Sequence, residues 1–173
     1  MKGRNYREPK GQPYTRMKYI HGAPPPKISK FMMGDTKSQF EYRFSLVAQG
    51  PVQVRHNALE AARVAANKVL FDALGETGYK IHLRLYPHII LRENRMIATA
   101  GADRLQEGMR RAFGKPTGRA ARIKYGQSIL DIYVNGNAIE AAKQALRASS
   151  KKLSVACVIN QEKLAAQAPQ VAA

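Results

Sequence analysis

The feature that most constrains the fold is an apolar stripe at helical spacing between residues 57 and 74, with alternating segments on both sides of it. The stripe consists of Leu59, Ala62, Ala66, Val69, Leu70 and Ala73. Asn57 is a candidate N-cap, Glu60 has the spacing of a capping box, and Gly75 offers a left-handed end. Because such a stripe needs a neighbouring layer to bury it, we expect this helix to pack on a sheet.

Alternation of apolar and polar residues predicts the strands of that sheet. They are expected at residues 40–47, 79–85, 88–92, 120–125, 127–134 and 153–159. The two before and after Gly126 are close enough to form a hairpin. A second amphipathic helix is predicted over 138–149, with Asn137 as its cap. The order indicates an α+β class: a two-layer sandwich in which two helices cover one face of a mixed, mostly antiparallel sheet.

The positive charge of the chain is concentrated in two blocks. The net charge is +17, and residues 1–44 and 80–124 carry almost all of the excess, whereas residues 45–79 are neutral. Such self-repulsion favours a polyanionic partner whose binding releases counterions. Nucleic acid is the first candidate. An anionic membrane surface is the second, and a basic protein without such a partner is the third.

The first block lies in an extended segment, residues 1–38, rich in proline, glycine and basic residues, with tyrosines between them. It shows no helical or strand period, and Pro24, Pro25 and Pro26 favour polyproline II. We expect an RNA-binding arm that precedes a domain over 39–160, with a tail over 161–173. The alternative is that residues 1–38 form a solvated tail without a partner.

The second block contains a loop over 101–112 that is rich in arginine and small residues and lacks a clean period. A loop of this length inside a domain is usually functional. The alternative is a short surface helix over 103–112. A P-loop is a poor match, because five residues separate Gly108 from Gly114 where four are needed, and Pro116 replaces the Ser or Thr that holds magnesium.

Catalytic and metal-binding patterns are not apparent, so we expect no enzyme activity, no metal and no cofactor. The four histidines, His21, His56, His82 and His88, show no metal-ligand spacing with Cys157 or with carboxylates. Asp103 and Glu107 could form an acid pair, but a helix cap or a salt link to a nearby arginine explains them better. His82 is expected on the polar side of its strand, either stacked, bound to phosphate or solvated.

The cellular location is expected to be the cytoplasm. Cys157 is the single cysteine, which excludes a disulfide within the chain and fits a reducing compartment. The chain has no apolar run long enough for a spanning helix, and no apolar segment follows the basic N-terminus as in a secretory signal. We therefore expect no membrane association.

The loop and its flanks resemble one family of ribosomal proteins. The motifs that carry the resemblance are Gly101-Ala102-Asp103-Arg104-Leu105-Gln106, Gly108-Met109-Arg110, Ala112-Phe113-Gly114-Lys115-Pro116, Gly118 and Ala121-Arg122, with Ala58–Arg63, Ala66-Asn67-Lys68 and Arg84–His88 upstream. The family is the universal large-subunit one called L-ten-e in archaea and eukaryotes and L-sixteen in bacteria, and the similarity extends over roughly residues 3–160. The chain ends soon after the last predicted strand, without the extension of eukaryotic members, so an archaeal source is expected.

The resemblance implies a structural protein bound to large-subunit rRNA, near the 5S rRNA and the cleft for aminoacyl-tRNA, with other large-subunit proteins as neighbours. The loop then points toward the peptidyl-transferase region. It implies loop contacts by Arg104, Gln106, Met109, Arg110 and Arg111, and a loop base of Arg92, Arg95 and Lys115. The further RNA-binding residues that we expect are Lys2, Arg4, Arg7, Lys10, Arg16, Lys18, Arg84, His88, Arg119, Arg122 and Lys124. Glu107 departs from the basic character of the loop and leaves the contact there open.

Two other functions compete with this one. An RNA-modifying enzyme could use the same basic surface, but it needs a convergent acid, base or metal site. A free RNA chaperone would bind single strands promiscuously and sediment mainly outside ribosomes.

We predict that deletion of residues 102–111 leaves the domain folded and impairs tRNA binding or translation, because the loop is expected to serve RNA and not the core. Thermal unfolding of the purified variant and tRNA binding to reconstituted particles measure the two effects. Loss of folding would show that the segment belongs to the core.

Overall fold

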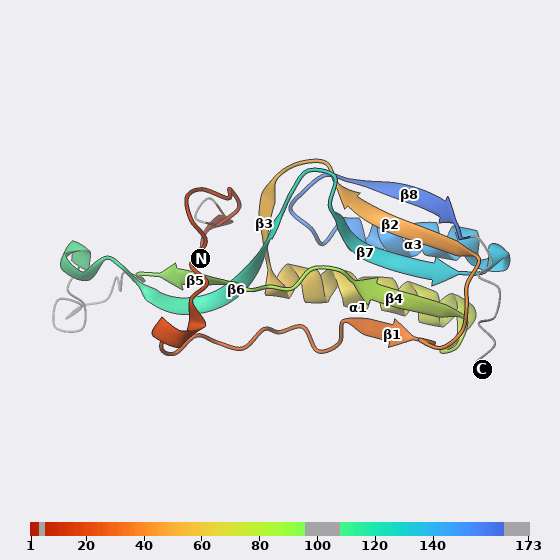
Figure 1. The fold of residues 1–173 in the computed structure, drawn as a ribbon, viewed down its shortest axis with the longest axis horizontal. Helices are drawn as coiled ribbons and strands as arrows, with labels where there is room; N and C mark the ends of the chain where they lie inside the picture. The colour runs from red at the N-terminus through yellow and green to blue at the C-terminus, as the bar shows by residue number, and fades with distance from the viewer. Residues whose placement is uncertain (4–5, 96–107, 165–173) are drawn as a thin grey trace, which may run out of the picture.

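The computed structural model describes residues 1–3, 6–95 and 108–164. Two antiparallel sheets and two long helices make up the fold, and Figure 1 shows the two sheets following one another along the length of the molecule. The α+β class expected from the sequence is confirmed. Instead of one sheet, however, the strands form two.

The larger sheet has five strands. Their order is β1 (Met32–Gly34), β4 (Tyr79–Leu83), β7 (Ser128–Val134), β2 (Tyr42–Ala48) and β8 (Cys157–Lys163). All of these neighbours are antiparallel. Helices α1 (His56–Leu74) and α3 (Ile139–Ser150) pack side by side behind this sheet, on one of its faces (Figure 1). The last strand was expected over 153–159 and begins later, at Cys157, because the chain bends over residues 153–155.

The smaller sheet repeats the order of the three central strands of the larger one. It consists of β3 (Val52–Arg55), β6 (Lys115–Ile123) and β5 (Ile89–Glu93), in that order. In the chain β2 leads into β3, β4 into β5, and β6 into β7. Three chain segments therefore run through both sheets, one after the other, and the smaller sheet extends from one end of the sandwich.

The predicted hairpin around Gly126 is wrong, because β6 and β7 belong to different sheets. The turn between them is fixed to the end of β2 instead: the N–H of Gly126 donates to the carbonyl of Ala48 at 2.9 Å, and the N–H of Ala48 donates to the carbonyl of Gln127 at 3.0 Å. Gly126 has a φ of +76°, which glycine adopts without strain. The chain therefore bends from one sheet into the next without reversing.

The core lies between the larger sheet and the helices. Phe44, Leu46, Ile81, Leu130 and Ile132 face the helices and are fully buried. From the helices come Leu59, Ala62, Ala66, Leu70, Ala142, Ala145 and Leu146. The apolar stripe predicted for α1 is thus confirmed, except that Val69 is half-buried and Ala73 is exposed at the last turn.

The predicted helix caps are wrong, although Gly75 does end α1, with a φ of +70°. Helix α1 begins at His56, one residue before the expected cap, and no side chain caps it. Glu60 instead accepts hydrogen bonds from Arg63 and from Ser29 of the N-terminal segment. The hydrogen bond from Arg63 holds the pKa of Glu60 below its usual value. The cap at Asn137 is also absent, because a 3-10 turn over Gly136–Ala138 precedes α3.

We predict that Leu59→Ala lowers the free energy of unfolding by about 2–5 kcal/mol, because it leaves a cavity beneath α1. Val64→Ala on the same helix is the matched control: Val64 is half exposed, and its truncation should stay within about 0.5 kcal/mol. Urea unfolding followed by circular dichroism measures both. Equal effects would contradict the assignment of the buried face.

Candidate nucleic-acid interface

The N-terminal segment is tied to both edges of the smaller sheet. The N–H of Gln53, on edge strand β3, donates to the carbonyl of Arg7 at 2.7 Å. The N–H of Ile90, on the opposite edge strand β5, donates to the carbonyl of Tyr14 at 2.9 Å. Residues 7–14 therefore run from one edge to the other and use hydrogen-bonding groups that edge strands would otherwise leave free.

Two arginines of the middle strand, β6, hold the same segment through its carbonyl groups. Arg122 donates from Nη1 to Gly11 at 2.8 Å and from Nη2 to Lys10 at 3.1 Å. Arg119 donates from Nε to the carbonyl of Pro24 at 2.8 Å. Because these arginines are three residues apart on a strand, they leave opposite faces of the sheet. The segment thus wraps around the smaller sheet, and we call residues 6–27 the strap.

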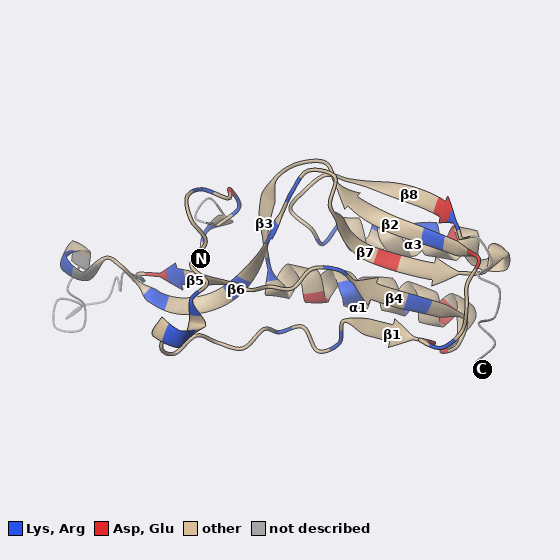
Figure 2. Ribbon diagram, viewed as in Figure 1, with Lys and Arg blue, Asp and Glu red and all other residues tan. Residues whose placement is uncertain are grey.

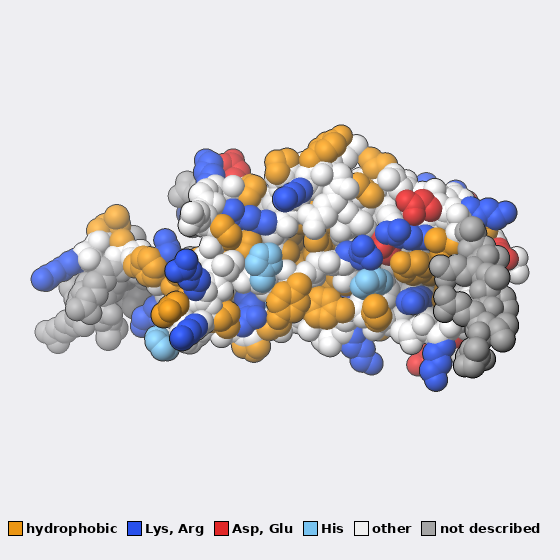
Figure 3. All heavy atoms as spheres, viewed as in Figure 1, with side chains coloured by type: hydrophobic (Ala, Val, Ile, Leu, Met, Phe, Trp, Pro, Cys, Tyr) orange, Lys and Arg blue, Asp and Glu red, His pale blue; other side chains and the backbone are white. Residues whose placement is uncertain are grey.

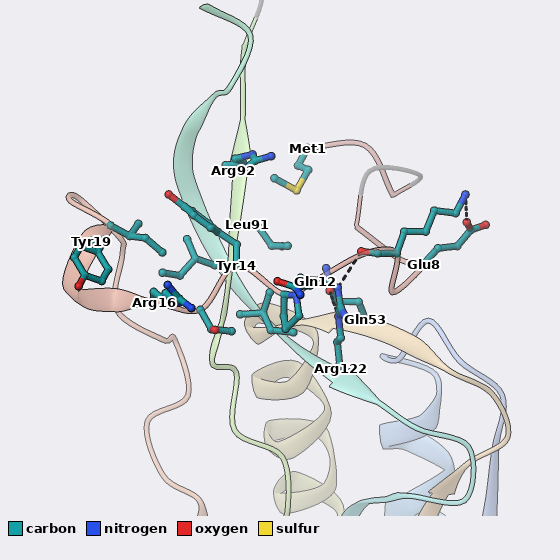
Figure 4. A pocket seen from close by; sticks show the side chains of 16 residues that line it. Met1, Glu8, Gln12, Tyr14, Arg16, Tyr19, Gln53, Leu91, Arg92 and Arg122 are labelled. Atoms are coloured by element: carbon teal, nitrogen blue, oxygen red, sulfur yellow. Dashed lines mark hydrogen bonds and ion pairs between the residues drawn. The ribbon is translucent and has the colours of Figure 1, made fainter.

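Between the strap and the sheet lies an open hollow of about 1010 Å³. Figure 4 shows cationic and aromatic side chains around it: Arg16 and Tyr19 from one part of the strap, Tyr14 beside Leu91, and Arg92 near Met1. Gln12, Gln53 and Arg122 line the opposite end. The lining combines cations, amides and rings, which are the groups that bind phosphates and bases.

Arg92 packs against two aromatic rings beside the hollow. Its guanidinium carbon is 5.3 Å from the ring centre of Tyr14 and 3.9 Å from that of Phe113. The two rings meet edge to face, with centres 5.9 Å apart. This cluster joins the strap, the end of β5 and the residues before β6. Phe113 stood in the family motif, but we did not predict it as a site residue; a large exposed aromatic beside a glycine was the available signal.

Gly114 allows the two ends of the predicted loop to meet. It has a φ of +81°, and a Cβ atom there would lie 2.7 Å from the carbonyl carbon of Glu93. Only glycine fits such a close backbone approach. Arg92, Arg95 and Lys115, which are expected at the loop base, lie at the end of β5, just after it and at the start of β6, and all three side chains are exposed.

The predicted RNA-binding side chains fall into distinct places. Exposed ones are Lys2, Arg7, Lys10, Arg16, Lys18, Arg84, His88, Arg92, Arg95, Met109, Arg110, Lys115 and Lys124. Many of these belong to the strap or to the strands of the smaller sheet, but Arg84 lies beside the larger one, where its N–H donates to the carbonyl of Ile129 at 3.0 Å. Arg119 and Arg122 are half-buried and hold the strap. Arg4, Arg104, Gln106 and the side chain of Arg111 lie outside the part that is described.

Three of these cations contact carboxylates of the chain. Lys10 lies 2.7 Å from Glu8, Arg95 lies 3.5 Å from Glu93, and Arg84 lies 3.7 Å from the buried Asp131. The hydrogen bond between Lys10 and Glu8 raises the pKa of the lysine and lowers that of the glutamate. Because the three cations are themselves well exposed, these pairs are weak and leave them able to bind phosphate.

His56 joins the strap to the first turn of α1. The N–H of Lys27 donates to its Nδ1 at 3.2 Å, and the imidazole is almost fully buried. Burial, and then Arg55, Lys27 and Arg119, lower the pKa of this histidine, so it stays neutral at neutral pH. In residues 1–3, 6–95 and 108–164, no three His, Cys, Asp or Glu side chains come together as metal ligands. Nor is any helix there both long and apolar enough to cross a membrane.

Together, the fold and the cation-lined strap define the class: a basic α+β protein built to bind nucleic acid. The sequence profile of ribosomal protein L16p/L10e matches residues 9–160, and the chain belongs to this family. The resemblance seen in the sequence is thereby confirmed. Because the members of this family are structural ribosomal proteins, the expectation that the protein is not an enzyme is confirmed. As a ribosomal protein it lies in the cytoplasm, which was also expected.

An archaeal source was expected, and relatives from archaea match most of the chain. A protein of Hyperthermus butylicus is 53% identical over 143 residues, which are 83% of this chain and 79% of the relative. One from Methanococcus maripaludis is 47% identical over 156 residues, 90% of each chain. One from Archaeoglobus fulgidus is 49% identical over 152 residues, 88% of this chain and 87% of the relative. Each is named large ribosomal subunit protein uL16.

We predict that Arg122→Met loosens the strap, because it removes two hydrogen bonds to strap carbonyls from a charged donor. One such bond contributes about 1.5 kcal/mol or more. The amide of Gln53, which donates to the strap, should therefore exchange its hydrogen at least roughly ten times faster. Arg147→Met, an exposed change on α3, is the control. Unchanged exchange at Gln53 would show that Arg122 does not anchor the strap.

Proposed function

We propose that the protein is a structural constituent of the large ribosomal subunit that binds rRNA through the smaller sheet and its strap. In this proposal it lies near the 5S rRNA and the cleft for aminoacyl-tRNA, beside other large-subunit proteins. Family membership supports the ribosomal role. The relatives are named large ribosomal subunit protein uL16, which supports a place in the large subunit.

The observation that carries the proposal is the fixed display of cations by the strap. Arg7, Arg16 and Lys18 are exposed on a segment whose backbone is bonded to the protein at Lys10, Gly11, Tyr14 and Pro24. Because the backbone is already placed, less conformational entropy is lost when these side chains meet phosphates. The alternative of a solvated tail has no explanation for these bonds.

The proposed contact with tRNA involves the predicted loop at the tip of the smaller sheet. The end of β5 and the start of β6 approach each other at Glu93 and Gly114, so the predicted loop is joined to the fold at this end of the smaller sheet. The strap presents its cations around the same sheet (Figure 2). This arrangement is consistent with a protein that binds rRNA through the smaller sheet and contacts tRNA from the same end.

A free RNA chaperone is the function that remains to be distinguished. Sucrose-gradient fractionation of cell extract separates the two: the proposal expects co-sedimentation with the large subunit through a high-salt wash, in amounts that match other subunit proteins. Sedimentation mainly in the free fractions would refute it.

We predict that affinity for a large-subunit rRNA fragment falls steeply with salt, and that the triple variant Lys10→Gln, Arg16→Gln and Lys18→Gln shows a shallower fall. Each lost phosphate contact should reduce the slope of log K against log salt by about 0.7–0.9. Filter binding between low and moderate salt measures both slopes. The control triple, Arg147→Gln, Lys151→Gln and Lys163→Gln, changes exposed cations of α3, of the residue after it and of β8, and should keep the wild-type slope.

A wild-type slope near zero would remove the electrostatic basis of the proposal. Equal slopes for the two triple variants would mean that the strap is not the RNA-binding element.

A further inference from the structure

A second row of polar side chains lies on the larger sheet, on the face that the helices leave uncovered. From Tyr79 to Ile89 every second residue is buried: Tyr79, Ile81, Leu83, Leu85, Pro87 and Ile89. The residues between them, Lys80, His82, Arg84, Tyr86 and His88, point the other way and are half-buried or exposed. Lys80 and His82 belong to β4, and Arg84, Tyr86 and His88 follow in the segment that leads to β5. The row alternates cations and rings.

The ring of Tyr86 is presented by a contact with the N-terminal segment. It stacks on Phe31, with ring centres 5.6 Å apart and planes inclined by 28°. The carbonyl of Phe31 accepts a hydrogen bond from the N–H of Leu83 at 2.8 Å, which holds Phe31 beside the end of β4. Tyr86 remains 52% exposed, so one ring face is backed by protein while much of the side chain stays open to solvent.

Neighbouring strands extend this surface. Tyr133 of β7 lies opposite Lys80, whose ammonium is 5.5 Å from the centre of its ring. Asp131 lies opposite His82, and Arg43 of β2 lies opposite Tyr133. Figure 3 shows cationic, histidine and hydrophobic side chains close together on this face.

The acidic groups of this face do not oppose an anionic ligand. Asp131 is completely buried and is held by Arg43 at 2.9 Å and by the hydroxyl of Ser128, with Arg84 at 3.7 Å. Glu162 lies 3.3 Å from the same Arg43. Arg84 is 47% exposed, and the contacts of Lys80 in the part of the chain that is described are with the carbonyl of Thr36 and the ring of Tyr133, so both cations can bind phosphate.

We propose that this open face is a second RNA site, which binds unpaired nucleotides by stacking bases on Tyr86 and holding their phosphates with Arg84 and Lys80. Single-stranded RNA is recognised in this way, by rings at intervals along a cationic track. The inference rests on the proposed rRNA-binding function. It adds unpaired nucleotides as a second kind of RNA ligand, because the cations of the strap are suited to the phosphates of folded RNA.

The chemistry of the row favours RNA over a protein partner. A protein interface is built around an apolar centre with few charges. Here the centre carries His82 and Arg84 beside a buried Asp131, and desolvating them against an apolar partner would be costly. Burial and the nearby Arg84 lower the pKa of His82, so its neutral ring can also lie against a base.

The test uses the full-length protein and a fluorescently labelled single-stranded octamer of uridine and adenosine, with a duplex of the same length as second ligand. Anisotropy titrations compare Tyr86→Leu with Tyr86→Phe. Loss of one stacked base should weaken octamer binding by about 5- to 150-fold for Tyr86→Leu, whereas Tyr86→Phe keeps the ring and should stay close to wild type. Tyr125→Leu is the matched control, because Tyr125 is 76% exposed in the turn between β6 and β7.

A measurement without substitutions guards against a folding defect in the variants. An octamer with 4-thiouridine is cross-linked to the wild-type protein, and mass spectrometry should place cross-links within residues 80–88 or at Tyr133. Cross-links confined to the strap would overturn the inference, as would equal octamer binding by Tyr86→Leu and Tyr125→Leu.

The two proposals fail separately. If Tyr86→Leu leaves octamer binding unchanged while the triple variant of the strap flattens the salt dependence with rRNA, only the second site is refuted. If the strap variant behaves like its control, the proposed function itself is refuted, whatever the octamer does.

Discussion

The bend between the two sheets is the constraint on which the rest of the molecule depends. Ala48 holds the turn at Gly126 through a pair of backbone hydrogen bonds, so the chain passes from β6 into β7 without reversing. Because three chain segments make the same transition, the strand order of one sheet is copied in the other. One sheet is then free to build a core with the helices, while the other extends from it with both faces available to the strap.

Arginine serves two purposes in this protein, and the environment decides which. Arg119 and Arg122 are half-buried on the middle strand of the smaller sheet, and carbonyl groups of the strap take up their donors. Arg16 and Arg92 are exposed beside the hollow, and in the proposed function they bind phosphates. The high positive charge thus includes an internal framework as well as a binding surface. A count of all cations would therefore overstate the number that are available for binding at the surface.

Local periodicity predicted much of the fold but not its long-range pairing. The stripe of α1 and the alternation around Ile81 and Leu83 were visible, because burial on one side leaves a period in the sequence. The hairpin at Gly126 was wrong, since a short turn looks the same whether the chain reverses or bends. The caps were missed because Glu60 is bound by Arg63, a competition that spacing does not reveal. For the site, the composition indicated that many cations are present. Which of them hold the strap and which stay exposed depends on contacts between residues about a hundred positions apart in the chain.

The anchoring of the strap has a consequence for the order of events during synthesis. Gly11 is made early, but its partner Arg122 follows 111 residues later, and Pro24 waits 95 residues for Arg119. At translation rates of about 5–20 residues per second, roughly 5–20 seconds pass before these two arginine anchors of the strap are made. Until then the carbonyl groups that they bind in the finished fold lack these partners. The segment made first therefore acquires its complete set of anchors only after most of the chain has been synthesised.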